Sequence, residues 1–312
     1  FCTLLNLTIL ASTLLTATTI MSIESHPLQK RLLSTTAISE PDPTMFGNDP
    51  NPRTPPATWS PDSKNWLRSR FHFSFAEWGR GPMGFGVLRV LNDDLVQPHR
   101  MFGPHPHRDM EIATYVVKGE LTHWHEDRSS RGGSSARESL GRGSVQFMTA
   151  GTGVTHSEGN DSDSPLRFIQ MWIVPRKRGL RPNYASCRGD AKQRDGQWQH
   201  LVGDVEDAAS GAAVRINQDC NIFVTELHKD ADEVALRIQP GRQAYVVNLE
   251  GQSSWAAGGD NGASLPTVTL DTYESGTVSG PAELLVRRGS ASGAAAATHI
   301  LVVEMAASAS TQ

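Results

Sequence analysis

The sequence predicts an all-β protein built from two β-barrels in tandem. Short apolar segments, rich in β-branched and aromatic residues, recur from Trp66 onward and are separated by Gly, Pro, Asn and Asp. No helix-rich pattern of apolar residues competes with them. The chain has 312 residues, of which 38% are hydrophobic and 20% are charged, which is ordinary for a globular protein. That length is sufficient for two domains.

The first barrel is expected at residues 59–185. Its strand candidates are residues 85–91, 111–117, 144–148 and 166–174. Between them, residues 126–143 are polar, with repeated Ser, Arg and Gly, and predict a long surface loop. The hydrophilic residues 186–199 are expected to be a linker.

The second barrel is expected at residues 200–306, followed by a short tail at 307–312. Its strand candidates are residues 213–217, 222–227, 233–238, 244–249, 267–270, 283–287 and 299–304. Two segments rich in Gly, Ser and Ala, 251–262 and 290–298, are expected to be loops.

Residues 1–58 are expected to be a disordered leader. The first residue is Phe1, which indicates a fragment or a reading frame that begins upstream of the true start. The first twenty residues are too polar to predict a membrane span. The run from Lys30 to Thr36 is weakly similar to an organelle presequence, although Glu24 counts against this. Residues 40–61 are dense in Pro, Asp and Asn, which predicts a disordered segment.

Charge and cysteine content exclude some functions. The formal net charge is −4, so no basic surface for nucleic acid is expected. Cys2, Cys187 and Cys220 are scattered, which predicts free thiols in a reducing compartment.

Two pairs of metal-binding residue types predict one metal site in the first barrel. His105 and His107 are separated by one residue, as are His156 and Glu158. In a β-strand, residues i and i+2 project from the same face, so each pair can direct two donors at one point. Three imidazoles and a carboxylate suit Fe(II), Mn, Ni, Cu or Zn and leave coordination positions open. The second half contains only isolated histidines, so no metal is expected there.

The residues around these pairs resemble known families. The segment 103–119 is similar to the first motif of the cupin β-barrels. More narrowly, the runs 105–111, 148–151 and 156–158 resemble the pirin family, and within it the bacterial pirin-like quercetinases. The runs 92–94 and 170–173 share this likeness, which is close over residues 66–184 and looser to about 305. The resemblance implies two cupin barrels of the jelly-roll type.

The identity of the carboxylate ligand has two candidates. The resemblance assigns the fourth ligand to Glu158. Glu111 is the rival, because it shares the parity of His105 and His107 and because many cupins use a glutamate at that place. Either carboxylate is also a candidate catalytic base. Another pair, His123 and His125, is expected to support ligands or to face solvent.

The resemblance implies a metal-dependent dioxygenase, with one metal per chain, expected to be Fe(II), that opens a flavonol-like ring with O2. The substrate would be a small planar polyphenol, and the apolar wall for it is expected from Phe75, Phe85, Phe147 and Met148. The alternatives are an iron-binding, redox-sensitive transcriptional co-regulator with a protein partner, and a metal-stabilised structural barrel. The resemblance implies a cytoplasmic or nuclear protein, with no membrane partner.

Overall fold

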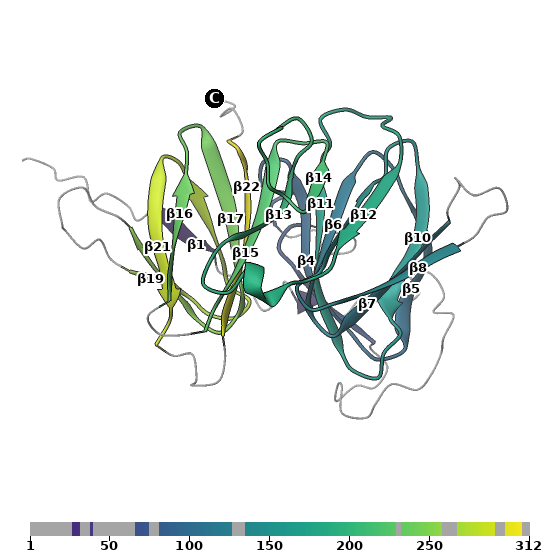
Figure 1. Cartoon of the computed structure of the whole chain (residues 1–312), viewed down its shortest axis with the longest axis horizontal. Coiled ribbons are helices and arrows are strands. Elements are labelled where there is room, and N and C mark those ends of the chain that lie inside the picture. Colours follow the sequence, from purple (N-terminus) through teal and green to yellow (C-terminus); the bar gives the residue numbers. More distant parts are fainter. Residues whose placement is uncertain are drawn as a thin grey trace, which may run out of the picture.

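The protein consists of two β-barrels that lie side by side (Figure 1). The computed structural model describes residues 27–31, 38–39, 66–74, 81–126, 135–228, 232–257, 267–290 and 297–307. Apart from one short 3-10 helix, η3 (Ala191–Gln193), the elements in these residues are strands. The prediction of an all-β double barrel is confirmed.

The first barrel closes two antiparallel sheets over each other. Its larger sheet has the order β12-β9-β6-β11-β4-β3-β2, and its smaller sheet has the order β5-β10-β7-β8. The strands of the larger sheet are β2 (Ile38–Ser39), β3 (Leu67–Phe71), β4 (Leu88–Val96), β6 (Glu111–Lys118), β9 (Val145–Thr149), β11 (Leu166–Ile173) and β12 (Asn183–Cys187). Those of the smaller sheet are β5 (Arg100–His107), β7 (Glu120–Glu126), β8 (Ser135–Gly141) and β10 (Val154–Asn160).

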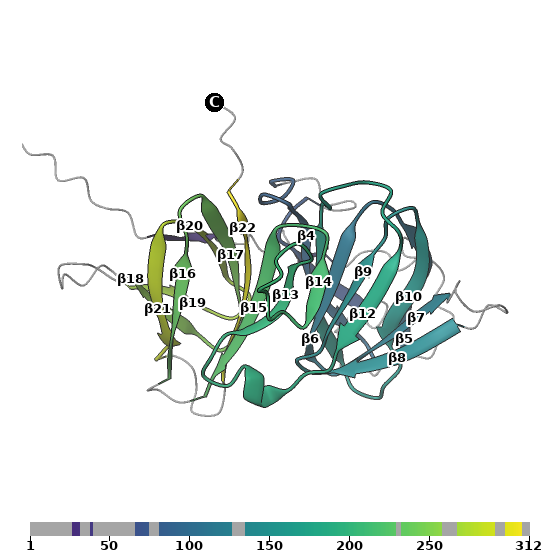
Figure 2. The ribbon, with the colours of Figure 1, turned by 45° about the horizontal axis from the view of Figure 1, so that its top comes forward.

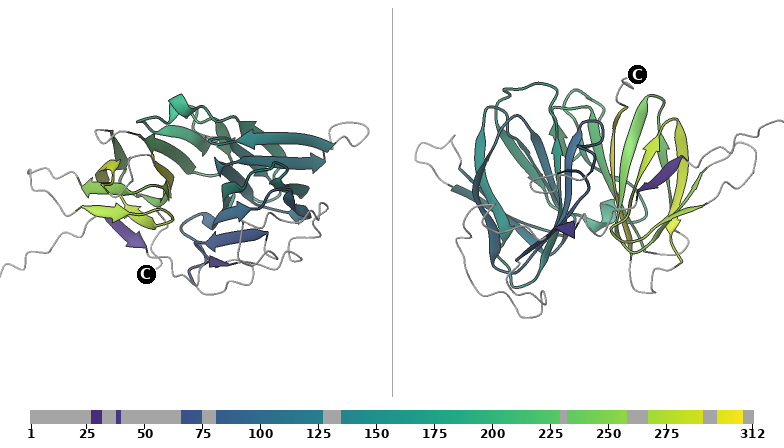
Figure 3. Two further views of the ribbon diagram at one scale, coloured as in Figure 1. Left: turned by 90° about the horizontal axis from the view of Figure 1, so that it is seen from below. Right: turned by 180° about the vertical axis from the view of Figure 1, so that it is seen from behind.

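The second barrel also has a seven-stranded and a four-stranded sheet, with orders β1-β20-β17-β22-β15-β13-β14 and β16-β21-β18-β19. Its strands pair antiparallel except β13 and β14, which are parallel. The strands of its larger sheet are β1 (Leu28–Arg31), β13 (Gln199–Asp204), β14 (Val214–Ile216), β15 (Cys220–Leu227), β17 (Arg242–Glu250), β20 (Ser275–Ser279) and β22 (Thr298–Ala306). Those of the smaller sheet are β16 (Glu233–Ile238), β18 (Ser253–Ala257), β19 (Val268–Leu270) and β21 (Ala282–Arg288). Figures 2 and 3 show the two barrels from other sides.

The two larger sheets pack against each other through a shared apolar core. A repeated sequence explains how, because Tyr-Val-Val occurs at 115–117 in β6 and at 245–247 in β17, the third strand of each sheet. In both repeats the Tyr and the second Val join the shared core, whereas the first Val points into its own barrel. Each Tyr hydroxyl also bonds a histidine across the interface, Tyr115 to His299 at 2.9 Å and Tyr245 to His72 at 3.0 Å.

The interiors of the two barrels differ in polarity. Fourteen buried apolar side chains fill the second barrel, including Trp255 and Leu28. The apolar cluster inside the first barrel has nine members. Buried polar side chains occupy much of the remaining interior of the first barrel, among them Asn92, Asp94 and Glu158. The first barrel is therefore the one with an interior suited to a polar site.

The expectation of a structureless leader at 1–58 is wrong for two segments. Residues 28–31 form β1, which pairs with β20 of the second barrel and buries Leu28. Residues 38–39 form β2, which pairs with β3. Strands this short have no periodicity of their own, and pairing with the edge of a sheet decides their structure. Most of the expected leader, including residues 40–58, lies outside the described residues.

The expected loop and linker also contain regular structure. Within the expected loop at 126–143, residues 135–141 form β8, which pairs with β7. The expected linker at 186–199 begins in β12 and includes η3 and the buried Arg194, which donates to Glu226 of the second barrel at 2.9 Å. Polar composition misled the prediction in both places, since charged side chains satisfied by partners can be ordered.

The turn between β9 and β10 contains a glycine that has no space for a side chain. Gly151 has φ +45°, and a Cβ atom there would lie 2.0 Å from the carbonyl oxygen of Leu180. We expect Gly151→Ala to lower the free energy of unfolding by about 1–3 kcal/mol, because both the backbone conformation and the space oppose a side chain. Gly141→Ala is the control, since a Cβ there meets nothing within 4 Å. Equal urea midpoints for the two variants would contradict this account.

Candidate metal centre

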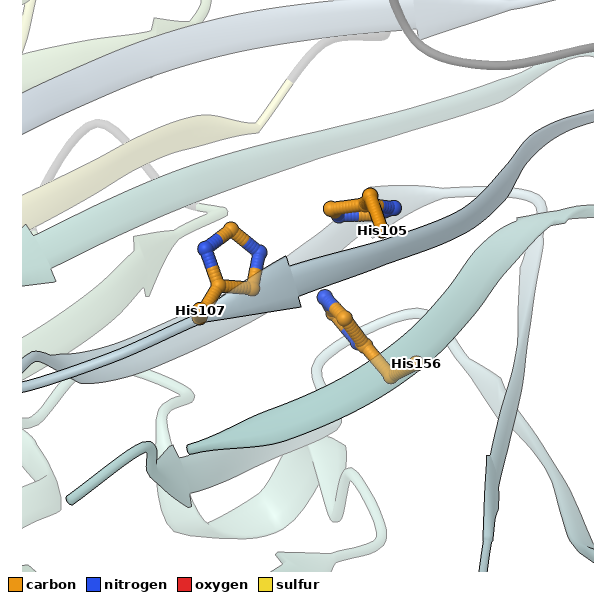
Figure 4. A group of neighbouring side chains, drawn as sticks. All are labelled: His105, His107 and His156. Carbon is orange, nitrogen blue, oxygen red and sulfur yellow. The ribbon is translucent and has the colours of Figure 1, made fainter. Parts of the chain in front are cut away.

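The metal-binding residue types are brought together by two neighbouring strands. β5 and β10 pair antiparallel, with His105 opposite His156. Because side chains alternate along a strand, His105 and His107 project from the same face of β5. Figure 4 shows these two rings on one strand and His156 on the next, directed at a common space. The local spacing and the strand register together create the site.

The geometry of the three histidines fits a metal ion. One ring nitrogen from each of His105, His107 and His156 lies within 4.8 Å of the others. The Nε2 atom of His107 is buried and has no hydrogen-bond partner among the described residues, which is costly unless a ligand binds it. The Nδ1 atom of His105 lies 2.8 Å from the carbonyl oxygen of Gly103, so its Nε2 atom would bind the metal.

The protonation states of His105 and His107 suit coordination. Burial lowers the pKa of His105 below its ordinary value, opposed by its bond to Gly103. Burial and the nearby His105 lower the pKa of His107 to about 4. Both rings are therefore neutral at pH 7, and neutral imidazole is the form that binds metals.

His123 supports His156 from the neighbouring strand β7. Its Nε2 atom lies 2.9 Å from Nδ1 of His156, and its ring stacks on Tyr184 with an interplanar angle of 6°. A metal would therefore be bound by Nε2 of His156, with the ring orientation held by the bond at Nδ1. The side chain of His125 lies outside the described side chains. His72 and His99 bond to Tyr245 and Asp163, respectively.

Glu158 shares a cavity with His105 and His107. The cavity is about 100 Å³ and is lined by Leu67, Ser69, Phe71, Asn92, Asp94, Phe102, His105, His107, Glu158, Gln170 and Trp172. Gln170 donates a hydrogen bond of 2.6 Å to Oε1 of Glu158. Burial and the nearby Asp94 raise the pKa of Glu158 to about 8, opposed by the bond from Gln170. A bound cation would offset this cost and favour the carboxylate.

Glu111 lies in a different environment. It begins β6 in the larger sheet, and the chain turns between His107 and Glu111, so strand parity does not relate the two. Thr149 donates to its carboxylate at 2.9 Å and Asn217 donates at 3.1 Å. Burial raises its pKa. Glu111 is not among the residues that line the cavity.

The expected apolar wall is wrong for three of its four residues. Phe85, Phe147 and Met148 do not line the cavity, and Phe85 instead packs against Tyr245 at the barrel interface. Phe75 lies outside the described residues. The observed apolar lining is Leu67, Phe71, Phe102 and Trp172. Trp172 contacts His107 edge to face, with ring centroids 4.9 Å apart. Trp172 could have been predicted from the sequence, because it is two residues from Gln170 in the strand segment 170–173, so both side chains lie on the same face.

The cavity carboxyl groups predict how stability depends on pH. Burial raises the pKa of Glu158 to about 8 and that of Asp94 to about 7. At pH values above the ordinary carboxyl pKa, the folded, metal-free chain therefore binds more protons than the unfolded chain. Its stability decreases as pH rises through this range. The lowered pKa of His107 acts in the opposite direction, but only below about pH 6.5.

We therefore expect the melting temperature of metal-free protein to fall between pH 6.5 and 8. Glu158→Gln should reduce this fall, because its amide does not titrate. Thermal melts of chelator-treated protein at several pH values measure both effects. A melting temperature that rises across this interval, or an unchanged slope in Glu158→Gln, would contradict the assignment of the proton to Glu158.

Fold and site define a double cupin whose first barrel contains the candidate metal site. A sequence model of pirin matches residues 56–173, and a model of the quercetinase C-terminal cupin domain matches residues 206–259. The chain is 37% identical over 188 residues to quercetin 2,3-dioxygenase of Escherichia coli, covering 60% of this chain and 75% of that protein. A pirin-like protein of Caulobacter vibrioides is 35% identical over 187 residues, covering 60% and 76%. The chain belongs to the pirin family.

Solved structures agree with this assignment. The crystal structure of YhhW from Escherichia coli has a TM-score of 0.63 and 30% identity, and the match covers 78% of this chain and 92% of that one. The bacterial pirin YhhW in complex with nickel(II) has a TM-score of 0.62 and 29% identity, with coverages of 78% and 93%. Among the described residues of the present chain, no helix is long and apolar enough to cross a membrane.

Proposed function

We propose that this protein is a metal-dependent dioxygenase of the quercetinase type, which opens a flavonol-like ring with O2. The observation that carries the proposal is the convergence of His105, His107 and His156 at one point, beside a cavity that also contains the buried Glu158. The names of relatives support the substrate class, since one of them is quercetin 2,3-dioxygenase. The same relatives do not favour the alternative of a transcriptional co-regulator.

The proposed ligands are His105, His107, His156 and Glu158. Fe(II) remains the expected metal, and the nickel complex of YhhW makes Ni(II) a candidate to test beside it. A divalent metal held there would lower the pKa of a coordinated hydroxyl group and supply the redox chemistry with O2. Glu158 is also the proposed proton acceptor, because a carboxylate at the metal site can take the proton of the coordinated substrate hydroxyl group. Glu111 is the rival for this role.

The size of the cavity limits how a flavonol would bind. An engineered cavity of about 150 Å³ accommodates benzene, and the cavity described above is smaller. A three-ring flavonol therefore cannot be enclosed in it. We propose that only the edge bearing the 3-hydroxyl group and a neighbouring hydroxyl group enters, and that the rest of the rings extends past His105 and His107, which are both partly exposed.

An oxygen electrode measurement tests this function. Protein reconstituted with Fe(II), Ni(II), Mn(II), Cu(II) or Zn(II) is mixed with quercetin in air. The proposal predicts loss of the flavonol absorbance together with consumption of one O2 per flavonol by at least one of these forms. If every metal-loaded form consumes no more O2 than the metal salt alone, the proposed function is wrong.

A further inference from the structure

Residues 92–94 are polar and buried, but none of them is a proposed metal ligand. β4 lies in the larger sheet of the first barrel, and its residues alternate between the two faces of that sheet. Asp93 points toward the second barrel. There its carboxylate accepts two hydrogen bonds, at 2.8 and 2.7 Å, from Arg167 of the neighbouring strand β11. Asn92 and Asp94 point the other way and line the cavity.

Asn92 and Asp94 have side-chain oxygen atoms that can accept more hydrogen bonds than the described residues donate to them. Asn92 is 4% exposed, and its Oδ1 atom has no hydrogen-bond partner among the described residues. Asp94 is 5% exposed, accepts a hydrogen bond from Ser69, and makes no ion pair within the described part of the chain. Buried acceptors of this kind are costly unless a donor reaches them.

We propose that Asn92 and Asp94 form a hydroxyl-binding wall that accepts hydrogen bonds from a second hydroxyl group of the substrate. They lie in the larger sheet, whereas His105 and His107 lie in the smaller sheet, and all four residues line one cavity. A polyphenol with one oxygen at the metal would thus present another hydroxyl to this wall. The inference rests on the proposed function and adds the substrate feature that the site selects.

A pair of ligands tests the wall. Quercetin and 3-hydroxyflavone share the metal-binding 3-hydroxyl and 4-keto groups, but 3-hydroxyflavone lacks the other hydroxyl groups. Their dissociation constants are measured by fluorescence quenching on protein loaded with Zn(II), which is not redox-active. We expect Asp94→Leu to raise the dissociation constant of quercetin at least about tenfold and Asn92→Leu about fivefold, whereas that of 3-hydroxyflavone changes less than about twofold.

Thermal stability separates a binding role from a structural one. Asn92→Leu removes an acceptor that has no partner, so its melting temperature should equal or exceed that of the wild type. Asn248→Leu in the second barrel is the matched control. Asn248 is fully buried, and its Oδ1 atom also lacks a partner among the described residues, but its Nδ2 atom donates to the carbonyl oxygen of Gly251 at 2.7 Å. Because Asn248→Leu loses that donated bond, this variant should melt about 2–4 °C lower.

The outcomes are distinct. Equal weakening of both ligands, no weakening of either, or a loss of stability in Asn92→Leu as large as that in Asn248→Leu would overturn the hydroxyl-binding wall alone. If wild-type protein binds neither flavonol, the proposed function fails as well. If Asp94→Leu does not fold, Asn92→Leu provides the same comparison by itself.

Discussion

Replacing His107 with alanine is expected to remove nearly all metal from the purified protein. This histidine supplies one of three converging nitrogens, and its buried Nε2 atom has no other partner among the described residues. Losing one of three imidazoles should weaken binding by more than the roughly 10–100-fold seen when only a supporting residue is lost. Elemental analysis after dialysis against buffer with no added metal measures the loss.

His200→Ala is the matched control for this experiment. His200 lies in the second barrel, where it bonds to Asn221 at 3.0 Å and stacks on Phe223. The variant should retain one metal per chain. Two metals per chain in the wild type, or unchanged metal content in His107→Ala, would show that the first barrel is not the single metal site.

The second large effect separates the two carboxylates. If Glu158 is both ligand and proton acceptor, Glu158→Gln should lower metal affinity at least about tenfold and the rate of flavonol cleavage roughly 10²–10⁴-fold. Glu111→Gln should keep the metal, because the Glu111 carboxylate is engaged by Thr149 and Asn217 outside the cavity. Competition with a coloured chelator gives the affinities.

The reverse pattern, with metal retained in Glu158→Gln and lost in Glu111→Gln, would assign the ligand to Glu111. Loss of metal in both variants would indicate that the site depends on the general integrity of the barrel. A thermal melt of each variant identifies this last outcome, because damage to the barrel would also lower the melting temperature strongly.

Sequence reasoning identified the histidines because their information is local. Two residues separated by one position on a strand face the same way, whatever the rest of the fold. His105, His107 and His156 were therefore predictable from spacing, and the pairing of β5 with β10 then brings them together. The parity argument for Glu111 does not hold, because the chain turns between His107 and Glu111.

The rest of the cavity could not be predicted in this way. Trp172, Gln170 and Asp94 come from β11 and β4, and they reach the histidines only because one sheet closes over the other. Spacing along the chain contains no information about that approach. The apolar wall was misassigned for the same reason, since an aromatic residue such as Phe85 can serve the barrel interface as well as a pocket.

The double-barrel fold was predictable, whereas its edges were not. Long apolar strands such as β11 and β22 identify themselves by composition. The four-residue β1 is recognisable only by its partner, since it occupies the same place beside β20 that β12 occupies beside β9. Such edge strands depend on a distant sheet and have little signal of their own.

The central claim is that one divalent metal is bound by His105, His107, His156 and Glu158. X-ray absorption spectroscopy of the metal-loaded protein tests it most directly, because imidazole ligands give a characteristic scattering pattern. The account predicts three imidazole nitrogens at about 2.0–2.1 Å with oxygen donors completing the site, and one fewer imidazole for any metal that remains in His107→Ala. A wild-type spectrum with two imidazoles, or with four, would contradict it.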